Sequence, residues 1–348
     1  MANLKTTVTD LNFIAVEDLE PRPSKIEDDN LCEQHYIQNT TRDESGRYTV
    51  RLPFKGEKFE LGHSKALVMK RFKALKRKFE ANPALKEAYE KEINNYLELG
   101  HMTLCEDDDE SGYYLPHHAV IKESSETTKC RVVFDASAKT STGISLNDVL
   151  LAGSTLQDTL VEQIIRFRSH PFVLTAGIEK MYRQVWVHPD DRKYQKILWY
   201  YNGRIMVFYI NTVVFGIKSA PFLAIRTLHQ LARNEEAKFA RASLLLCRDF
   251  YVDDFLSGAE TLEELLAIRD EMIQLLRRGG FTIRKWSSNH PSALDNIDKK
   301  IFELDCGVQQ SAVKKTLGIV WDSERDIFTY SCDPENTEFV SVERARLQ

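Results

Sequence analysis

The sequence lacks any long uninterrupted hydrophobic run, and its first ten residues are polar, so it predicts neither a transmembrane helix nor a signal peptide. It also lacks a C-x-x-C pair. Its six cysteines are widely spaced, which favours free thiols in a reducing, intracellular compartment, namely the cytoplasm, over a disulfide framework. The spacing Cys32-x-x-His35 would suit half of a zinc site, but no second half is apparent, so we expect no zinc and no membrane association.

An excess of positive charge is also missing. The net charge of −5 does not by itself indicate nucleic-acid binding. The charge is unevenly spread, however, and local patches matter more than the sum. With 348 residues, 43% of them hydrophobic, the chain can bury a large core as one multi-lobed domain or as two domains.

Two adjacent acids, Asp253 and Asp254, stand in the aromatic and β-branched stretch 250–255. Because two carboxylates are costly inside a buried strand, this pattern predicts a strand, a tight turn carrying the acids, and a second strand. A rigid carboxylate pair suits Mg²⁺, which catalyses nucleotidyl transfer from such sites; the alternative is a purely structural hairpin. Three other acidic runs have polar neighbours and are expected in solvated loops: 28–29, 107–109 and 190–191.

The chain up to residue 100 divides into three parts. Residues 1–46 are polar and aperiodic, which predicts a weakly structured segment, and the alternation in 47–54 predicts a strand. Residues 64–100 have helical periodicity, broken at Asn82-Pro83 into two helices. The first of these has a strongly basic face, which would suit a phosphate backbone or would simply be solvated.

Further along, the pattern predicts a hairpin that ends in strand 129–135. Lys129 and Arg131 lie two residues apart on one face of this strand and would suit a nucleotide triphosphate. The alternative is an ordinary exposed strand face. Asn202-Gly203 predicts a tight turn between two strands. The remaining expected elements are a helix at 156–168, a strand at 172–178, helices at 222–239 and 261–278, a strand at 281–286 and a hairpin at 315–330.

Seven motifs in this order resemble the reverse transcriptase domain of Pao/BEL-type LTR retrotransposon polyproteins. The likeness extends over roughly residues 30–330. The carrying stretches are Tyr114-Leu-Pro-His-His-Ala-Val120, Lys129-Cys-Arg-Val-Val-Phe-Asp-Ala-Ser137, Glu179-Lys-Met-Tyr-Arg-Gln184, Phe215-Gly-Ile-Lys-Ser-Ala-Pro221, Tyr251-Val-Asp-Asp254, Arg284-Lys-Trp286 and Leu317-Gly-Ile319.

The resemblance implies a role for each matching position. Asp253 and Asp254 would bind two catalytic Mg²⁺ ions. Tyr182 would pack under the incoming sugar and exclude a ribonucleotide. Lys129 and Arg131 would hold the triphosphate, and Phe215, Gly216 and Lys218 would line the nucleotide and template pocket. Lys285 lies in the region where polymerases of this kind place a proton donor for pyrophosphate, and the Leu317-Gly318 hairpin would grip the primer end. The implied partners are an RNA template, a DNA primer and deoxynucleoside triphosphates.

One position departs from the family pattern. The strand before Glu179 ends in the family with an aspartate that bridges both metals, and here that position is Gly177. Two metals held by fewer carboxylates would be misplaced, and misplacement that costs ~4 kcal/mol of transition-state stabilisation lowers the rate about a thousandfold. Glu179 would reach the metals only if the strand continued past Ile178, whereas we expect the chain to turn there. The sequence therefore predicts an impaired polymerase or, alternatively, a non-catalytic nucleic-acid-binding remnant.

The expected fold is α+β, with the fingers and palm of a right-hand polymerase, a helical N-terminal extension and a partial thumb. The expected parts are 1–46 as a weakly structured lead-in, 47–104 as the helical extension, 105–310 as fingers and palm, and 311–348 as the partial thumb or connection. The sequence has no aspartic-protease signature, and we expect the protease, ribonuclease H and integrase neighbours of a polyprotein to be absent from this chain.

Overall fold

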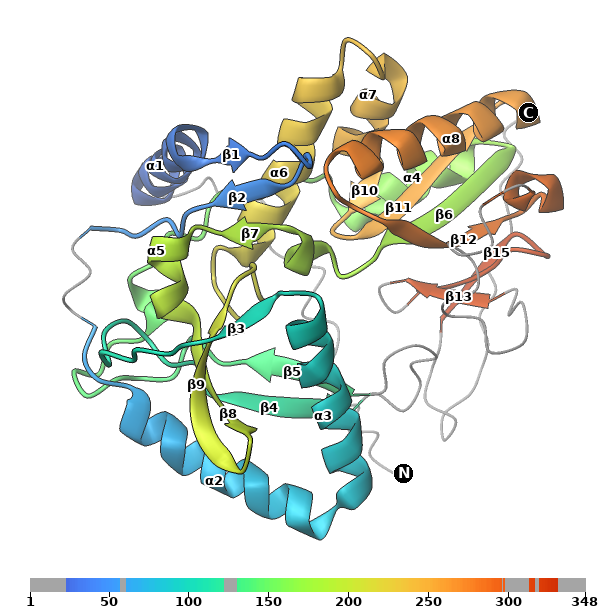
Figure 1. The fold of residues 1–348 in the computed structure, drawn as a ribbon. Helices are drawn as coiled ribbons and strands as arrows, with labels where there is room; N and C mark the ends of the chain where they lie inside the picture. Colours follow the sequence, from blue (N-terminus) through green and yellow to red (C-terminus); the bar gives the residue numbers. More distant parts are fainter. Residues whose placement is uncertain are drawn as a thin grey trace, which may run out of the picture.

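The computed structural model describes residues 23–56, 61–121, 130–295, 297, 313–316 and 319–330, and its helices and strands form an α+β fold (Figure 1). The helices are α1 (Pro23–Asn39), α2 (Lys65–Ala81), α3 (Pro83–Glu98), α4 (Leu160–Ser169), α5 (Pro189–Arg192), α6 (Ala220–Glu235), α7 (Ala240–Arg248) and α8 (Leu262–Arg278). The strands are β1 (Thr41–Arg42), β2 (Tyr48–Val50), β3 (Met102–Leu104), β4 (His117–Ile121), β5 (Cys130–Phe134), β6 (Phe172–Ile178), β7 (Trp186–Val187), β8 (Lys196–Tyr201), β9 (Arg204–Ile210), β10 (Phe250–Tyr251), β11 (Asp254–Ala259), β12 (Ile283–Ser288), β13 (Val313–Thr316), β14 (Ile319–Asp322) and β15 (Ile327–Tyr330).

The palm sheet has four antiparallel strands in the order β10-β11-β6-β12, which confirms the three segments expected from the sequence. Side chains alternate between its two faces. Phe255 and Ala176 belong to the face that packs on α8 in the main core. Val173 and Leu256 lie on the other face and pack against Phe167 of α4. Helices therefore cover both faces of this sheet.

The fingers lobe consists of α2, α3, the three-stranded sheet β3-β9-β8 and the hairpin β4-β5, and it forms the lower part of the molecule in Figure 1. The Asn202-Gly203 turn joins β8 to β9 as predicted. Aromatic rings hold α2 and α3 on the sheets: Phe72 lies 6.0 Å and Tyr89 5.5 Å from Trp199, centroid to centroid. The helices are thus packed into this lobe, and the expected boundary between residues 104 and 105 would separate β3 from its partner β9.

The two fingers helices form where their periodicity predicts. In α2 the buried side chains recur every three or four residues, so one face carries all the apolar contacts: Val68, Phe72, Leu75 and Phe79. Asn82 ends α2 and caps α3, because its side chain accepts a hydrogen bond from the backbone N–H of Leu85. Pro83 follows as the first residue of α3, where its missing N–H is not needed.

Residues 23–46 correct the expectation of a weakly structured lead-in, because they form α1 and β1. Helix α1 has a weakly apolar sequence and depends on long-range contacts with α6. The Tyr36 hydroxyl lies 3.0 Å from Thr227 Oγ1, and Glu33 accepts from the buried guanidinium of Arg226 at 2.9 Å. Tertiary partners almost two hundred residues away stabilise this helix, so the local sequence pattern could not predict it. Residues 1–22 lie outside the described part of the chain.

Two of the acidic runs expected in solvated loops contain a carboxylate that is shielded from solvent by ion pairs: Asp108 is 13% exposed and Asp191 is 1% exposed. The carboxylate of Asp108 lies 2.7 Å from the ammonium of Lys196, which is fully buried, and 2.8 Å from that of Lys65. Asp191 is 1% exposed and accepts from Arg51 and from the backbone N–H of Leu52. A buried carboxylate is tolerated because several donors surround it, and those donors are far away in the sequence.

A third antiparallel sheet, β13-β14-β15, follows the palm sheet and includes the expected hairpin. It contacts α4 through Arg168, which donates to the Asp326 carboxylate at 2.7 Å. The expected primer-end residues Leu317 and Gly318 lie outside the described residues, as does most of the 311–348 segment. None of the helices in the described ranges is long and apolar enough to span a bilayer.

Candidate active site

The carboxylate pair lies on the hairpin formed by β10 and β11. Tyr251 pairs with Asp254 across the hairpin, so Val252 and Asp253 form its two-residue turn. Val252 has φ of +56°, which costs a β-branched residue on the order of 1–3 kcal/mol. Its N–H donates to Gln157 Oε1 at 3.0 Å, and this bond helps to hold the strained turn. The turn exposes Asp253 and leaves Asp254 partly exposed as the first residue of β11.

Gly177 is directly opposite Asp254 in the palm sheet. The register of β6 and β11 pairs the two residues, and Ile178 N–H donates to the Asp253 carbonyl at 2.8 Å. A Cβ built on Gly177 would lie 3.6 Å from Asp254 Oδ1 and 3.9 Å from the Asp253 carbonyl oxygen, which is ordinary van der Waals contact. The structure therefore brings together the three positions that the sequence predicted as a metal site, and it leaves room for a side chain at the third.

These residues fit a divalent cation in part. Mg²⁺ is commonly held by one or two carboxylates, with water and substrate phosphate completing its octahedron, and Asp253 and Asp254 supply that number. A second ion needs a bridging carboxylate, and Gly177 has none. Throughout the described segments, no group of three or more His, Cys, Asp or Glu side chains is placed to hold a metal ion. The donor set is therefore sufficient for one cation and short of a ligand for a pair.

Glu179 does not take the place of the missing carboxylate. Strand β6 ends at Ile178, and Lys180 has φ of +49°, so the chain turns where the sequence predicted. The Glu179 carboxylate lies 2.7 Å from Arg284 Nε and 3.3 Å from the Lys180 ammonium. Its charge is compensated by two cations, so recruiting it to a metal would break both ion pairs.

Tyr182 and Phe215 form an aromatic pair near the hairpin. Their ring centroids are 4.2 Å apart; Tyr182 is buried, and 58% of Phe215 is exposed. Burial, and then the negative charge of Asp253, raises the pKa of Tyr182 to about 12, so its hydroxyl stays protonated at neutral pH. A buried ring beside an exposed one is suited to contact a sugar and a base from one side.

The glycine after Phe215 allows a close backbone approach. Gly216 has φ of +101°, and a Cβ there would lie 1.9 Å from the carbonyl oxygen of Phe134 in β5. Asn147 fixes this loop: its side chain donates to the Gly216 carbonyl at 2.9 Å and accepts from the backbone N–H of Lys218 at 2.8 Å. Neither Asn147 nor the turn-supporting Gln157 was predicted from the sequence, because a single amide side chain gives no periodic signal.

Of the other predicted nucleotide ligands, the structure describes Arg131, Lys218 and Lys285. Arg131 is exposed on β5, on the face opposite the buried Cys130 and Val132. Lys218 is exposed after the Gly216 loop. Lys285 has φ of +58° at the irregularity of β12 that follows Arg284. Lys129 lies outside the described residues.

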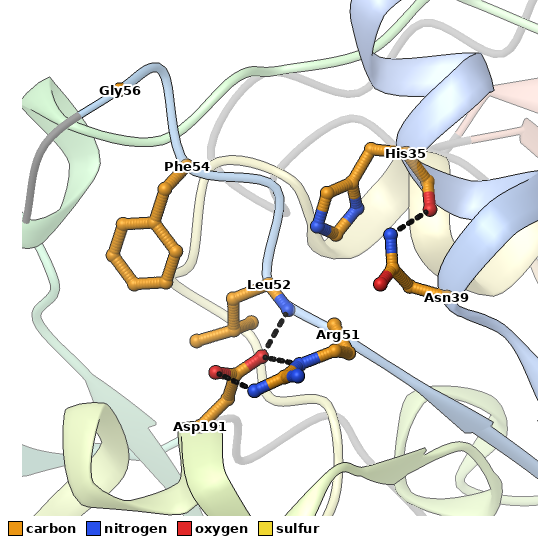
Figure 2. Close-up of a pocket in the computed structure, with 7 residues that line it drawn as sticks. All are labelled: His35, Asn39, Arg51, Leu52, Phe54, Gly56 and Asp191. Carbon is orange, nitrogen blue, oxygen red and sulfur yellow. Dashed lines mark hydrogen bonds and ion pairs between the residues drawn. The ribbon is translucent and has the colours of Figure 1, made fainter.

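A pocket of about 310 Å³ lies elsewhere, between α1, the segment after β2, and α5 (Figure 2). Asp191 reaches Arg51 and the backbone N–H of Leu52 there, and Asn39 donates to the His35 carbonyl at 2.8 Å. Its charged groups, Arg51 and Asp191, thus bind one another and join the segment after β2 to α5. The pocket contains none of the predicted site residues, and we assign it a structural role.

The match to one family model agrees with the sequence motifs. Residues 123–286 match the family model described as reverse transcriptase (RNA-dependent DNA polymerase), a range that includes Gly177, the acidic hairpin and every predicted nucleotide ligand. No curated protein matches the sequence. Among solved structures, the foamy viral protease-reverse transcriptase dRH in complex with double-stranded DNA has 15% identity and a TM-score of 0.46, covering 68% of this chain and 34% of that chain. This chain thus spans about a third of the length of that protein.

Proposed function

We propose that the reverse transcriptase domain in residues 123–286 belongs to a Pao/BEL-type LTR retrotransposon polyprotein, and that it is an RNA-directed DNA polymerase of greatly reduced activity. Its partners would be an RNA template, a DNA primer and deoxynucleoside triphosphates. The family match supports the reaction class, and the order of the seven motifs supports the subfamily. The reduced activity is argued from Gly177, whose register with Asp254 is the observation that carries the proposal.

The side chains would divide the work of nucleotidyl transfer as follows. Asp253 and Asp254 would hold Mg²⁺, which when bound neutralises phosphate charge and activates the primer hydroxyl. Tyr182 and Phe215 would position the sugar and base of the incoming nucleotide. Lys129 and Arg131 would bind the triphosphate through charge-assisted hydrogen bonds, and Lys218 would line the nucleotide and template pocket. Lys285 Nζ would supply a proton to the leaving pyrophosphate.

The missing carboxylate sets the expected rate. Two carboxylates compensate less of the charge of two cations than three do, and they fix the ions less well. A misplacement that costs ~4 kcal/mol of transition-state stabilisation lowers the rate about a thousandfold. The same observation favours a second candidate function, a non-catalytic nucleic-acid-binding protein that keeps the fold.

Primer extension distinguishes the two candidates. The purified chain, its Gly177→Asp variant and an Asp254→Asn variant are compared on an RNA template with a DNA primer and Mg²⁺. Weak extension by the parent chain, lost in Asp254→Asn and raised about a thousandfold in Gly177→Asp, supports an impaired polymerase. Extension by Gly177→Asp alone supports the non-catalytic binder. Equal rates for the parent chain and Gly177→Asp would show that the glycine does not limit catalysis.

A further inference from the structure

Helix α2 is strongly basic in a chain that is acidic overall. Its 17 residues include seven cations and a single acid, Glu80, whereas the net charge of the whole chain is −5. The helix lies outside the stretch that matches the reverse transcriptase family, so none of the predicted site roles accounts for its charge. Neighbouring α3 has a mixed surface of lysines and glutamates, so only α2 has an excess of basic charge in this pair.

The charge is arranged on one side of the helix. Val68, Phe72 and Phe79 belong to the face that packs into the fingers lobe. Lys70, Lys73 and Arg77 are spaced three and four residues apart, so they form one stripe on the opposite, exposed face. A stripe of cations along a rigid helix is a preorganised linear array of charge, and α2 is about 25 Å long at 1.5 Å per residue.

Three cations of α2, namely Lys65, Arg71 and Lys76, have acidic partners in the protein. Lys65 lies 2.8 Å from Asp108, Arg71 lies 2.6 Å from Asp135, and Lys76 lies 3.8 Å from Glu80. Within the described ranges, no acidic side chain forms an ion pair with any member of a second group, which consists of Lys70, Lys73, Arg77 and Lys78. Four like charges kept together without counter-charges repel one another, and an external polyanion would relieve that repulsion.

We propose that the exposed face of α2, defined by Lys70, Lys73, Arg77 and Lys78, is a nucleic-acid interface that binds the phosphate backbone outside the active site. The stretch from Lys70 to Lys78 extends about 12 Å at 1.5 Å per residue, so with one phosphate per 3.4 Å along a B-form strand it runs beside about three or four phosphates. The contact reads no sequence, because the phosphates that it binds are the same for every base. Figure 1 shows α2 along the outer edge of the fingers lobe, well separated from the β10-β11 hairpin, so it would bind a part of the strand that is not being copied.

A membrane surface fits the same helix less well. Amphipathic helices that lie on membranes insert an apolar face between the lipids. The apolar face of α2 is already occupied: Phe72 and Phe79 lie 6.0 Å and 6.4 Å from the Trp199 ring. The exposed face of α2 therefore offers a membrane charged side chains and no apolar face to insert. The choice of nucleic acid as the polyanion rests on the proposed function.

Salt-dependent binding tests the interface in the full chain. Fluorescence anisotropy with labelled single-stranded RNA and with an RNA–DNA hybrid is measured between about 50 and 200 mM salt, because each phosphate contact contributes roughly 0.7–0.9 to the slope of log K against log salt. The test variant combines Lys70→Gln, Lys73→Gln and Arg77→Gln. Its matched control removes three exposed lysines elsewhere, through Lys86→Gln, Lys91→Gln and Lys238→Gln. Glutamine keeps helix propensity, and circular dichroism and melting verify that both variants fold.

The expected result is a slope smaller by about 2–3 in the α2 variant and little changed in the control. A single Lys73→Glu change, which reverses one charge, is expected to weaken binding more than Lys73→Gln. Equal slopes for all three proteins, or an equal loss in the control, would overturn the interface. If the α2 variant loses binding to phosphatidylserine vesicles and keeps binding to RNA, α2 is a membrane surface instead. If the parent chain binds neither RNA nor the hybrid at low salt, the proposed function itself fails.

Discussion

Gly177 and Asp254 occupy opposite positions on β6 and β11, and a Cβ on the glycine would lie 3.6 Å from Asp254 Oδ1. On the other side of Gly177, Arg284 of β12 occupies the matching position in the same cross-strand row. Directly paired residues project to the same face of a sheet. The bare position therefore has an acid on one side and a base on the other, and substitutions there test both packing and charge.

Gly177→Ala is expected to stabilise the protein. The new methyl meets its nearest neighbours at ordinary contact distance, and glycine inside a strand costs roughly 0.5–1 kcal/mol relative to alanine. Thermal unfolding should shift upward by about 1–2 °C. Gly216→Ala is the contrasting variant, since its Cβ would lie 1.9 Å from the Phe134 carbonyl oxygen with φ of +101°, and it should lose at least about 2 kcal/mol. A destabilised Gly177→Ala protein would contradict the space seen at this position.

Gly177→Asp is expected to make folding stability depend on Mg²⁺. The added carboxylate lies beside Asp254 and the exposed Asp253, which is unfavourable until a cation joins them. A ligand that binds only the folded state stabilises it by RT ln(1 + [L]/Kd), about 2.7 kcal/mol at a hundred times Kd. Melting temperatures are measured with and without Mg²⁺ for the parent chain, Gly177→Asp and the uncharged Gly177→Asn. A Mg²⁺ response no larger in Gly177→Asp than in Gly177→Asn would exclude a three-carboxylate site here.

Local pattern was sufficient where a segment's own residues determine its structure. The buried stripe of α2, the Asn82 cap and the Asn202-Gly203 turn each specify an element without distant help, and the structure has all three. The acidic hairpin belongs to the same group. That this hairpin lies beside Gly177 could be predicted only from the resemblance of the motifs to a known family. The local sequence does not show it, because β6 and β11 become neighbours in the sheet only after folding.

The sequence did not predict the structure where a helix or a side chain is stabilised by residues far away in the chain. Helix α1 depends on the pair formed by Glu33 and Arg226, 193 residues apart, and Asp191 is buried because Arg51 reaches it. Asn147 and Gln157 bond backbone groups 69 and 95 residues away. A single side-chain amide has no charge and belongs to no periodic pattern. The sequence therefore does not distinguish an amide that bonds a distant backbone group from one on the surface.

Tyr182→Val is expected to weaken discrimination against ribonucleotides. The ring of Tyr182 is buried against Phe215, and its loss opens space beside the position proposed for the sugar. Differences of pocket size are worth roughly 10–200-fold in specificity. Single-nucleotide incorporation of a ribonucleotide and its deoxynucleotide is compared in the Gly177→Asp background, where activity is expected. Tyr182→Phe keeps the ring and should keep the selectivity; similar selectivity in Tyr182→Val would remove the proposed role.

Two buried histidines are expected to destabilise the protein as the pH falls. Burial, followed by the charges of Arg183, Arg47 and Lys180, lowers the pKa of His101 to about 3. Burial lowers the pKa of His117 to about 4; its Nε2 lies 2.9 Å from the Leu198 carbonyl oxygen, which it reaches as a donor in the neutral ring.

The sign of the effect follows from the direction of these shifts. An unfolded histidine has a pKa of about 6.5, so below that pH the unfolded chain binds protons that the folded chain does not. The free energy of unfolding is therefore largest above about pH 6.5 and falls as the pH drops toward 4, by up to about 1.4 kcal/mol per pH unit for each histidine. Urea unfolding at pH 7 and pH 5 measures this slope. The double variant His101→Gln and His117→Gln should have a smaller slope, whereas the exposed control His63→Gln should match the parent chain. An unchanged slope in the double variant would mean that carboxylates, and not these two rings, control acid unfolding.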